Sequence, residues 1–216
     1  MPTIATTSIP VPTHDTDDLV LIGPIVRLQV QIAHLKHGER PVRWYVPAGI
    51  APVTALRLDP GGVVGFDGDV MVNDVHHRDH TISRFRGDNG VSVGFTSHYD
   101  SMRAQYGAFL HDGIAGENIL VGSDAMHPED EFSGGIVFMT AEGPVELMQV
   151  QVAPPCVEFG KFCLGYANDQ RADARVAEVV KFLHEGRRGF YASWRQPDRQ
   201  PYSPRLAIGD LVYRRR

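Results

Sequence analysis

Apolar and polar residues alternate in the first patterned segment of the chain. Over positions 26 to 32 the even positions carry Val26, Leu28, Val30 and Ile32, and the odd positions carry arginine or glutamine. This period of two is typical of a strand with one buried face. Similar strand patterns occur at residues 54–59, 136–140 and 145–152, and the sequence AEGP predicts a hairpin between the last two.

Two later segments have helical spacing instead. Residues 97–110 begin with Ser97 and Asp100, which form a capping-box pattern, and residues 171–186 stop at Gly186, a residue type that often ends helices. The apolar positions are Tyr99, Met102, Tyr106 and Leu110 in the first segment, and Val176, Val179, Val180 and Leu183 in the second. We expect both helices to pack their apolar faces on the core as scaffold.

These patterns predict a mainly β fold with a few helices. The strands are punctuated by glycine and proline and do not alternate regularly with helices, so we expect a closed or partly closed, antiparallel-rich β-barrel with peripheral helices. Residues 1–18 are rich in Thr, Pro and Asp without periodicity and are expected to be a flexible lead-in. Residues 19–216 are expected to form a single domain.

Composition narrows the functional classes. The 216 residues carry a net charge of −5, with no basic stripe apart from the terminal RRR, which argues against nucleic acid as a partner. The sequence has no apolar leader and no apolar run long enough to span a membrane, and it contains only 2 cysteines. We therefore expect a cytoplasmic protein with free thiols and a small-molecule ligand or substrate.

Polar side chains interrupt two apolar stretches. Glu117 and Asn118 precede the aliphatic run ILV in GIAGENILV, so two polar groups enter what is predicted to be a buried strand. The alternative is a turn with local hydrogen bonds. Arg84 and Arg86 alternate before the Gly-Asp-Asn-Gly turn that contains Asn89, an arrangement suited to holding an anion. A surface hairpin with solvated arginines explains this second stretch as well.

A histidine cluster offers a different interpretation. DVHHRDH contains His76, His77 and His80, close to the H-x-H-x-D-H run of binuclear zinc hydrolases. When the ends of the two runs are aligned, Val75 stands where the first histidine ligand belongs. A polar loop is therefore the favoured interpretation, and a zinc-dependent hydrolase is the alternative.

Both cysteines lie in APPCVEFGKFC, and their spacing fits neither a redox C-x-x-C pair nor paired zinc motifs. By itself, Cys156 is well explained as a small apolar side chain beside two prolines.

The ordered set GGVVGFDGDV, RFRGDNGVSVGF, GIAGENILV, APPCVEF and EGRRGFYASW…AIGDLV resembles the molybdenum-cofactor sulfurase C-terminal (MOSC) domain family, over about residues 20 to 214. The resemblance implies a β-barrel-rich fold and a pocket for the molybdenum cofactor (molybdopterin). It also implies that Cys156 is the family cysteine, which would ligate molybdenum or carry sulfur as a persulfide. It assigns no role to Cys163.

The resemblance further implies how the ligand would be held. Arg84, Arg86 and the Gly-Asp-Asn-Gly turn would bind the pterin phosphate, and Glu117 and Asn118 would hydrogen-bond its amide-like edge. A nearby cation such as Lys161 would favour the Cys156 thiolate.

The chain also departs from the family. Many relatives have an arginine shortly before the Pro-Cys pair, whereas this chain has Ala153. It has no pyridoxal-phosphate domain of the full sulfurases and no iron-sulfur or flavin module, so a separate cysteine desulfurase or electron-donor protein is expected as a partner. Two activities remain open, reduction of N-hydroxylated substrates and sulfur transfer, with a non-catalytic anion-binding barrel as the alternative.

Overall fold

A computed structural model describes residues 18–83, 85, 90–194 and 203–216. Among these residues, seven strands close a barrel in the order β1, β14, β10, β11, β12, β8 and β9, with β9 pairing back to β1. Their bounds are β1 Leu19–Gln31, β8 Val91–Phe95, β9 Ile119–Val121, β10 Ile136–Thr140, β11 Gly143–Val152, β12 Phe190–Trp194 and β14 Leu211–Arg215. Most neighbours are antiparallel, and β8 with β9 is a parallel pair. The predicted mainly β, barrel-like fold is confirmed.

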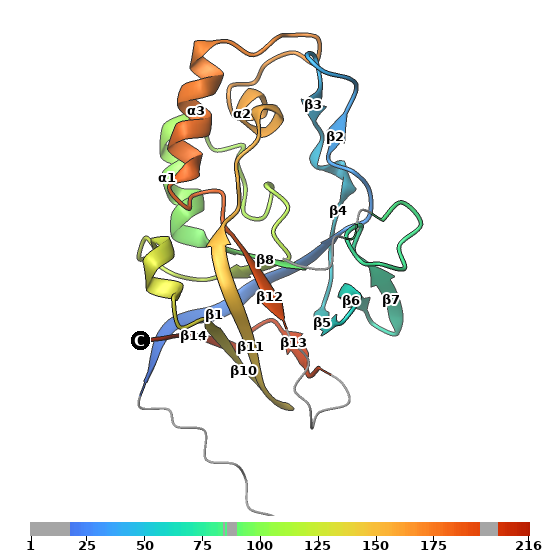
Figure 1. Cartoon of the computed structure of the whole chain (residues 1–216), viewed down its shortest axis with the longest axis vertical. Coiled ribbons are helices and arrows are strands. Elements are labelled where there is room, and N and C mark those ends of the chain that lie inside the picture. The colour runs from blue at the N-terminus through green and yellow to red at the C-terminus, as the bar shows by residue number, and fades with distance from the viewer. Residues whose placement is uncertain (1–17, 84, 86–89, 195–202) are drawn as a thin grey trace, which may run out of the picture.

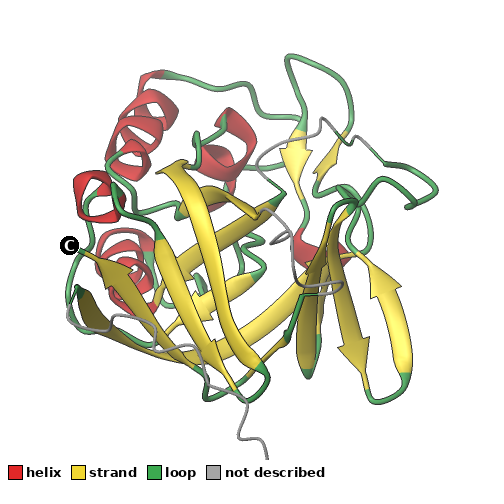
Figure 2. Ribbon diagram, turned by 60° about the horizontal axis from the view of Figure 1, so that its bottom comes forward, coloured by secondary structure: helices red, strands yellow, loops and turns green. Residues whose placement is uncertain are grey.

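Two smaller sheets flank the barrel. The first has the order β13 (Arg205–Ala207), β5 (Ala55–Asp59), β6 (Gly62–Asp67) and β7 (Val70–Asn73), and the second pairs β2 (Lys36–His37) with β3 (Trp44–Tyr45). Strand β4 (Ile50–Pro52) extends the barrel sheet beside the end of β1. Figure 2 shows the four-stranded sheet standing beside the barrel.

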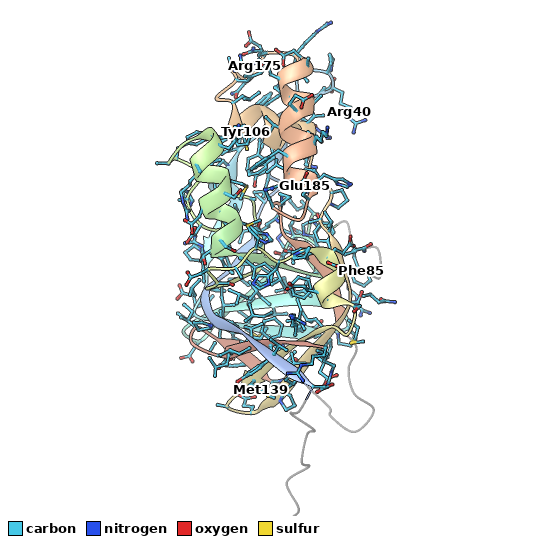
Figure 3. The ribbon with its side chains drawn as sticks, turned by 90° about the vertical axis from the view of Figure 1, so that its left-hand side faces the viewer. Arg40, Phe85, Tyr106, Met139, Arg175 and Glu185 are labelled. Carbon is cyan, nitrogen blue, oxygen red and sulfur yellow. The ribbon has the colours of Figure 1, made fainter. Side chains whose placement is uncertain are left out.

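The α-helices gather at one end of the barrel (Figures 1 and 2). They are α1 (Thr96–Tyr106), α2 (Val157–Cys163) and α3 (Ala174–His184). The described residues also include the short 3-10 helices η1 (Pro47–Gly49), directly before β4, and η2 (Glu129–Phe132). In Figure 3, Arg175 of α3 lies near one end of the long axis and Met139 of β10 near the other. The functional site described below lies where α2 and the loops before β9 and β12 meet.

Strand β1 confirms the first predicted strand but corrects its faces. Val26 and Ile32 were expected to be buried with Leu28 and Val30, yet they are 41% and 45% exposed, and the polar Gln29 is buried. A bulge between Ile25 and Arg27 changes which side chains face the core. The Gln29 and Gln31 side-chain amides donate to the carbonyl oxygens of residues 113 and 116, so a covering loop buries the polar side of the strand.

The other predicted elements are largely confirmed. Strands β5, β10 and β11 coincide with the three later strand patterns, and β10 and β11 form the expected antiparallel hairpin. Helix α3 ends just before Gly186, whose φ of 82° needs glycine. The predicted lead-in at residues 1–18 falls almost wholly outside the described residues.

Helix α1 is confirmed with two corrections. Its N-cap is Phe95, without a side-chain cap hydrogen bond, because Ser97 Oγ donates to the carbonyl oxygen of Ala125 and Asp100 accepts from Arg103. The predicted capping box is therefore wrong. The helix ends at Tyr106, so Leu110 reaches the core from the following turn instead of from the helix.

Candidate functional site

The segment that precedes α2 places the thiol of Cys156 at the N-terminus of that helix. Cys156 is extended and its Sγ accepts from the backbone N–H of Phe159 across 3.5 Å. Gly160 lets α2 approach α3, because a Cβ there would lie 3.2 Å from a Val176 methyl group. Cys156 is partly exposed, whereas Cys163, at the other end of α2, is buried. Both thiols are free, as expected.

The loop after α3 lies beside the segment that precedes Cys156. Ala153 N donates to the carbonyl oxygen of Gly189 across 2.9 Å, which joins the segment before Cys156 to the segment that carries Arg188. The Arg188 guanidinium carbon lies 5.6 Å from the centre of the Phe159 ring. Because Phe159 also donates to Cys156 Sγ, the thiol and this guanidinium border the same buried residue.

Arg188 is held by a buried carboxyl group. Its Nη1 donates to Glu117 Oε1 across 3.4 Å, and Tyr99 donates its hydroxyl to Glu117 Oε2 across 2.6 Å. The Glu117 side chain is 1% exposed and the Arg188 side chain 13% exposed. Burial raises the pKa of Glu117, although the Arg188 charge and the Tyr99 hydroxyl oppose this shift. Burial by itself lowers the pKa of Arg188, but the charges of Glu117 and the neighbouring tyrosines together raise it.

Tyr45 of β3 completes what we call the Cys156–Arg188 cluster, formed by Cys156, Arg188, Glu117, Tyr99 and Tyr45. The Tyr45 hydroxyl donates to the carbonyl oxygen of Ile114, and its ring packs edge-on to Phe159 with centroids 5.0 Å apart. Burial raises the pKa of Tyr45, and the charges of Arg188, Glu117 and Cys156 all act on it. Five separate chain segments therefore contribute a side chain to this cluster.

Of the residues predicted for the site, Cys156 and Glu117 meet in this cluster. Asn118 is buried as predicted, but its amide is used by the scaffold. Its Oδ1 accepts from the Ser92 backbone and hydroxyl, and its Nδ2 donates to Asp74 Oδ2 and to the carbonyl oxygen of Gln29. Although burial by itself raises the pKa of Asp74, hydrogen bonds and charge from His76 lower it on balance. Asn118 therefore ties β8 to β1 instead of facing Arg188.

Lys161 has a different environment from the one expected beside the thiol. It is 2% exposed, and its Nζ donates to the carbonyl oxygen of Arg43 across 3.1 Å. Arg43 in turn pairs with Glu158 at 2.6 Å. Lys161 therefore anchors α2 to the strand that carries Tyr45. Arg84, Arg86 and Asn89, predicted to bind the phosphate, lie outside the described residues.

The cation that the sequence reasoning missed is Arg188. The signal was present in the GRRGFYA stretch, where two adjacent arginines precede a strand. In the structure they separate, because Arg187 pairs with the exposed Glu185 while Arg188 turns inward to Glu117.

The histidine cluster does not converge on one point. His76 Nδ1 contacts Asp74 at 2.8 Å, His77 Nε2 contacts Asp59 at 3.0 Å, and His80 Nδ1 accepts from Ile82 N. Across the described part of the chain, no three His, Cys, Asp or Glu side chains gather as a metal site would require. The three imidazoles serve turns and strand ends at separate places.

Comparisons with known proteins give information about the fold. No protein-family model matches the chain, and no curated protein matches it either. A crystal structure of a hypothetical protein covers 93% of this chain and 71% of its own, at 11% identity and a TM-score of 0.52. The YuaD protein of Bacillus subtilis covers 88% of this chain and 96% of its own, at 14% identity and a TM-score of 0.49. The first likeness shows that another protein shares this fold, and at that identity it shows the fold alone.

Proposed function

We propose that this chain binds the molybdenum cofactor (molybdopterin), with Cys156 as the thiol that meets it. The observation that carries the proposal is that a partly exposed thiol and a fixed cation border the same residue, since Cys156 Sγ accepts from the backbone N–H of Phe159 and the Arg188 guanidinium lies 5.6 Å from its ring centre. The ordered motifs that resemble the MOSC family provide independent support, since Cys156, Glu117 and Arg188 all lie within them.

The residues of the cluster suit an anionic ligand with a soft metal. A cysteine sulfur is a soft ligand and must be deprotonated to bind or to carry sulfur. A guanidinium is a planar multiple donor suited to phosphate or another anion, and Arg188 is held on one side by Glu117. When bound, the cofactor supplies a redox-active metal centre that the side chains themselves lack.

The chain's own residues would do the positioning. Glu117 and Tyr99 fix the direction of Arg188, and Phe159 and Tyr45 line the apolar side of the cluster and exclude water from it. Arg84, Arg86 and Asn89 remain the predicted phosphate contacts, and Asn118 and Lys161 support the elements around the cluster.

Two activities follow from a bound cofactor. In the first, a separate electron-donor protein supplies electrons for the reduction of N-hydroxylated substrates. In the second, a separate cysteine desulfurase transfers a sulfane sulfur to the Cys156 thiolate. A non-catalytic barrel that binds another small anion at Arg188 is the runner-up. We place the protein in the cytoplasm in this proposal, and none of the helices in the described segments is long and apolar enough to cross a bilayer.

The test uses the two cysteines as matched variants. The wild-type protein, Cys156→Ser and Cys163→Ser are purified from a host that makes the cofactor, and bound molybdenum and oxidised pterin fluorescence are measured. Near-stoichiometric molybdenum and pterin are expected in the wild type and in Cys163→Ser, with loss in Cys156→Ser. Absence of both from the wild type, or equal retention by both variants, contradicts the proposal.

A further inference from the structure

A second group of reactive side chains lies away from the Cys156–Arg188 cluster, between the end of β9 and η2. Ser123 Oγ lies 2.7 Å from His127 Nε2, and His127 Nδ1 lies 3.0 Å from Glu131 Oε2. The three residues follow one another at intervals of four along a single segment. In Figure 1, η2 is the short yellow helix beside the lower end of α1.

The imidazole is fixed in place by its surroundings. The His127 ring packs against Phe95 with centroids 4.6 Å apart and against Phe132 at 6.0 Å. Its backbone N–H donates to Nε2 of the buried His98 across 3.1 Å. Only 8% of the His127 side chain is exposed, so the ring cannot rotate freely away from Ser123.

The carboxylate selects the tautomer. A proton on Nδ1 donates to Glu131, which leaves Nε2 as an acceptor for the Ser123 hydroxyl proton. Arg214 Nε lies 3.6 Å from the same Glu131 oxygen and holds the carboxylate on this side. Ser123 Oγ also lies 3.4 Å from the carbonyl oxygen of Ala125, a distance clearly longer than the 2.7 Å contact with His127.

We infer that Ser123, His127 and Glu131 form a nucleophile, general base and positioning carboxylate that act on small acyl esters. These are the distances and the order of roles that activate a serine, whatever the fold that carries them. Ser123 is partly exposed, and the neighbouring Met126 is 43% exposed, so the hydroxyl is reachable beside an apolar side chain. Asp124 and Asp130 are exposed nearby and would repel anionic substrates, which favours short neutral acyl groups.

The reaction balances without a cofactor. Ser123 Oγ bonds to the acyl carbon while its proton passes to His127 Nε2 and then to the departing alkoxide, which leaves as the alcohol. Water then attacks the acyl carbon, the bond to Ser123 Oγ breaks, the carboxylic acid leaves, and the serine recovers its proton through His127.

The test measures covalent labelling and turnover. The full chain is treated with an alkyl fluorophosphonate, which phosphonylates an activated serine and releases fluoride, and the label is located by peptide mass spectrometry. Hydrolysis of p-nitrophenyl acetate is followed in parallel. The variants are Ser123→Ala, Glu131→Gln and, as the matched control on the same segment, the exposed Ser133→Ala.

We expect one label per chain, on Ser123, in the wild type and in Ser133→Ala, and none on this segment in Ser123→Ala. Glu131→Gln should slow labelling by about tenfold or more and lower kcat for the ester with KM changed by less than about twofold, because it disturbs the base and not the approach of the substrate. A wild type that is not labelled, a label that persists in Ser123→Ala, or an unchanged rate in folded Glu131→Gln overturns the inference. If Glu131→Gln does not fold, the wild type and Ser123→Ala decide it alone.

Discussion

Arg188 and Glu117 are 71 residues apart in the chain and meet in the interior, where Arg188 Nη1 donates to Glu117 Oε1 across 3.4 Å. Tyr99 satisfies the second carboxyl oxygen at 2.6 Å. Two charges removed from water are tolerated only when each is paired and hydrogen-bonded, so these residues form one electrostatic unit. The unit connects the loop before β9 to the loop before β12, and it borders Phe159, the residue that contacts Cys156.

Removing one charge of this pair should be costly. Glu117→Gln leaves Arg188 without its counter-charge, and we expect it to lower the free energy of unfolding by about 3 to 5 kcal/mol in urea titrations. Glu185→Gln is the control, because Glu185 pairs with Arg187 at a 65% exposed position and its loss should cost less than about 1 kcal/mol. Adding Arg188→Met to Glu117→Gln should recover part of the loss, and equal costs for the two single glutamine variants would contradict the pairing.

The sequence predicted that Glu117 is buried with partners but could not identify Arg188 as one of them. A carboxylate that interrupts an apolar run can be recognised from the local sequence. Arg187 and Arg188 are adjacent and chemically alike, and they differ in the partners that the fold brings to them, Glu185 for Arg187 and Glu117 for Arg188. The faces of β1 were mispredicted for the same reason. The alternation is visible in the sequence, but the loop that covers Gln29 is not. Long-range contacts, not local pattern, determined what was missed.

The two thiols should differ strongly in reactivity. Burial raises the pKa of Cys163 to about 12, and the residue is 2% exposed, whereas Cys156 is partly exposed. Because the thiolate is the reacting form, we expect iodoacetamide at pH 8 to modify Cys156 at least about a hundredfold faster than Cys163. The rates are measured on Cys163→Ser and Cys156→Ser, each of which keeps one thiol. Comparable rates would show that α2 opens readily.

His98 should make the protein sensitive to acid. Burial lowers its pKa from 6.5 to about 4, assisted by the charges of His127 and Arg187 and opposed by the hydrogen bond to Gly186. Its Nδ1–H donates to the carbonyl oxygen of Gly186, and its Nε2 accepts from His127 N, so a second proton would place two donors face to face. Below pH 6.5 the His98 imidazole binds a proton in the unfolded chain but remains neutral in the folded chain until about pH 4. The free energy of unfolding therefore decreases as pH falls from 6.5 to 4.

That window can be measured directly. From the size of the shift we expect His98 to contribute a loss of roughly 3 kcal/mol between pH 7 and pH 4. In urea unfolding, His98→Asn should show a smaller loss over this range than the wild type, because asparagine does not titrate there. His111→Asn, at an exposed position, should show the same dependence of the free energy of unfolding on pH as the wild type. If His98→Asn loses as much stability between pH 7 and pH 4 as the wild type, another group causes the acid sensitivity.

Gly189 should be the glycine on which the Cys156–Arg188 cluster depends most. Its φ is 92°, and a Cβ would lie 2.7 Å from the carbonyl oxygen of Val93 and 3.2 Å from Glu117 Cγ. Gly189→Ala therefore adds a steric conflict to the strain of a left-handed backbone, and it displaces the carboxylate that holds Arg188. Gly165 is the control, since its φ of 64° is also positive but a Cβ there meets nothing within 4 Å.

We expect Gly165→Ala to lower the free energy of unfolding by about 1 to 2 kcal/mol, the cost of the left-handed conformation alone. Gly189→Ala should lower it by at least about 2 kcal/mol more, since backbone and a buried carboxylate must both move. It should also change the alkylation rate of Cys156 in a Cys163→Ser background, because Ala153 is bonded to the carbonyl oxygen of Gly189 and carries the segment that leads to the thiol. If the two alanine variants lower the free energy of unfolding equally and Cys156 is alkylated at an unchanged rate, the approach of Gly189 to Glu117 does not position the cluster.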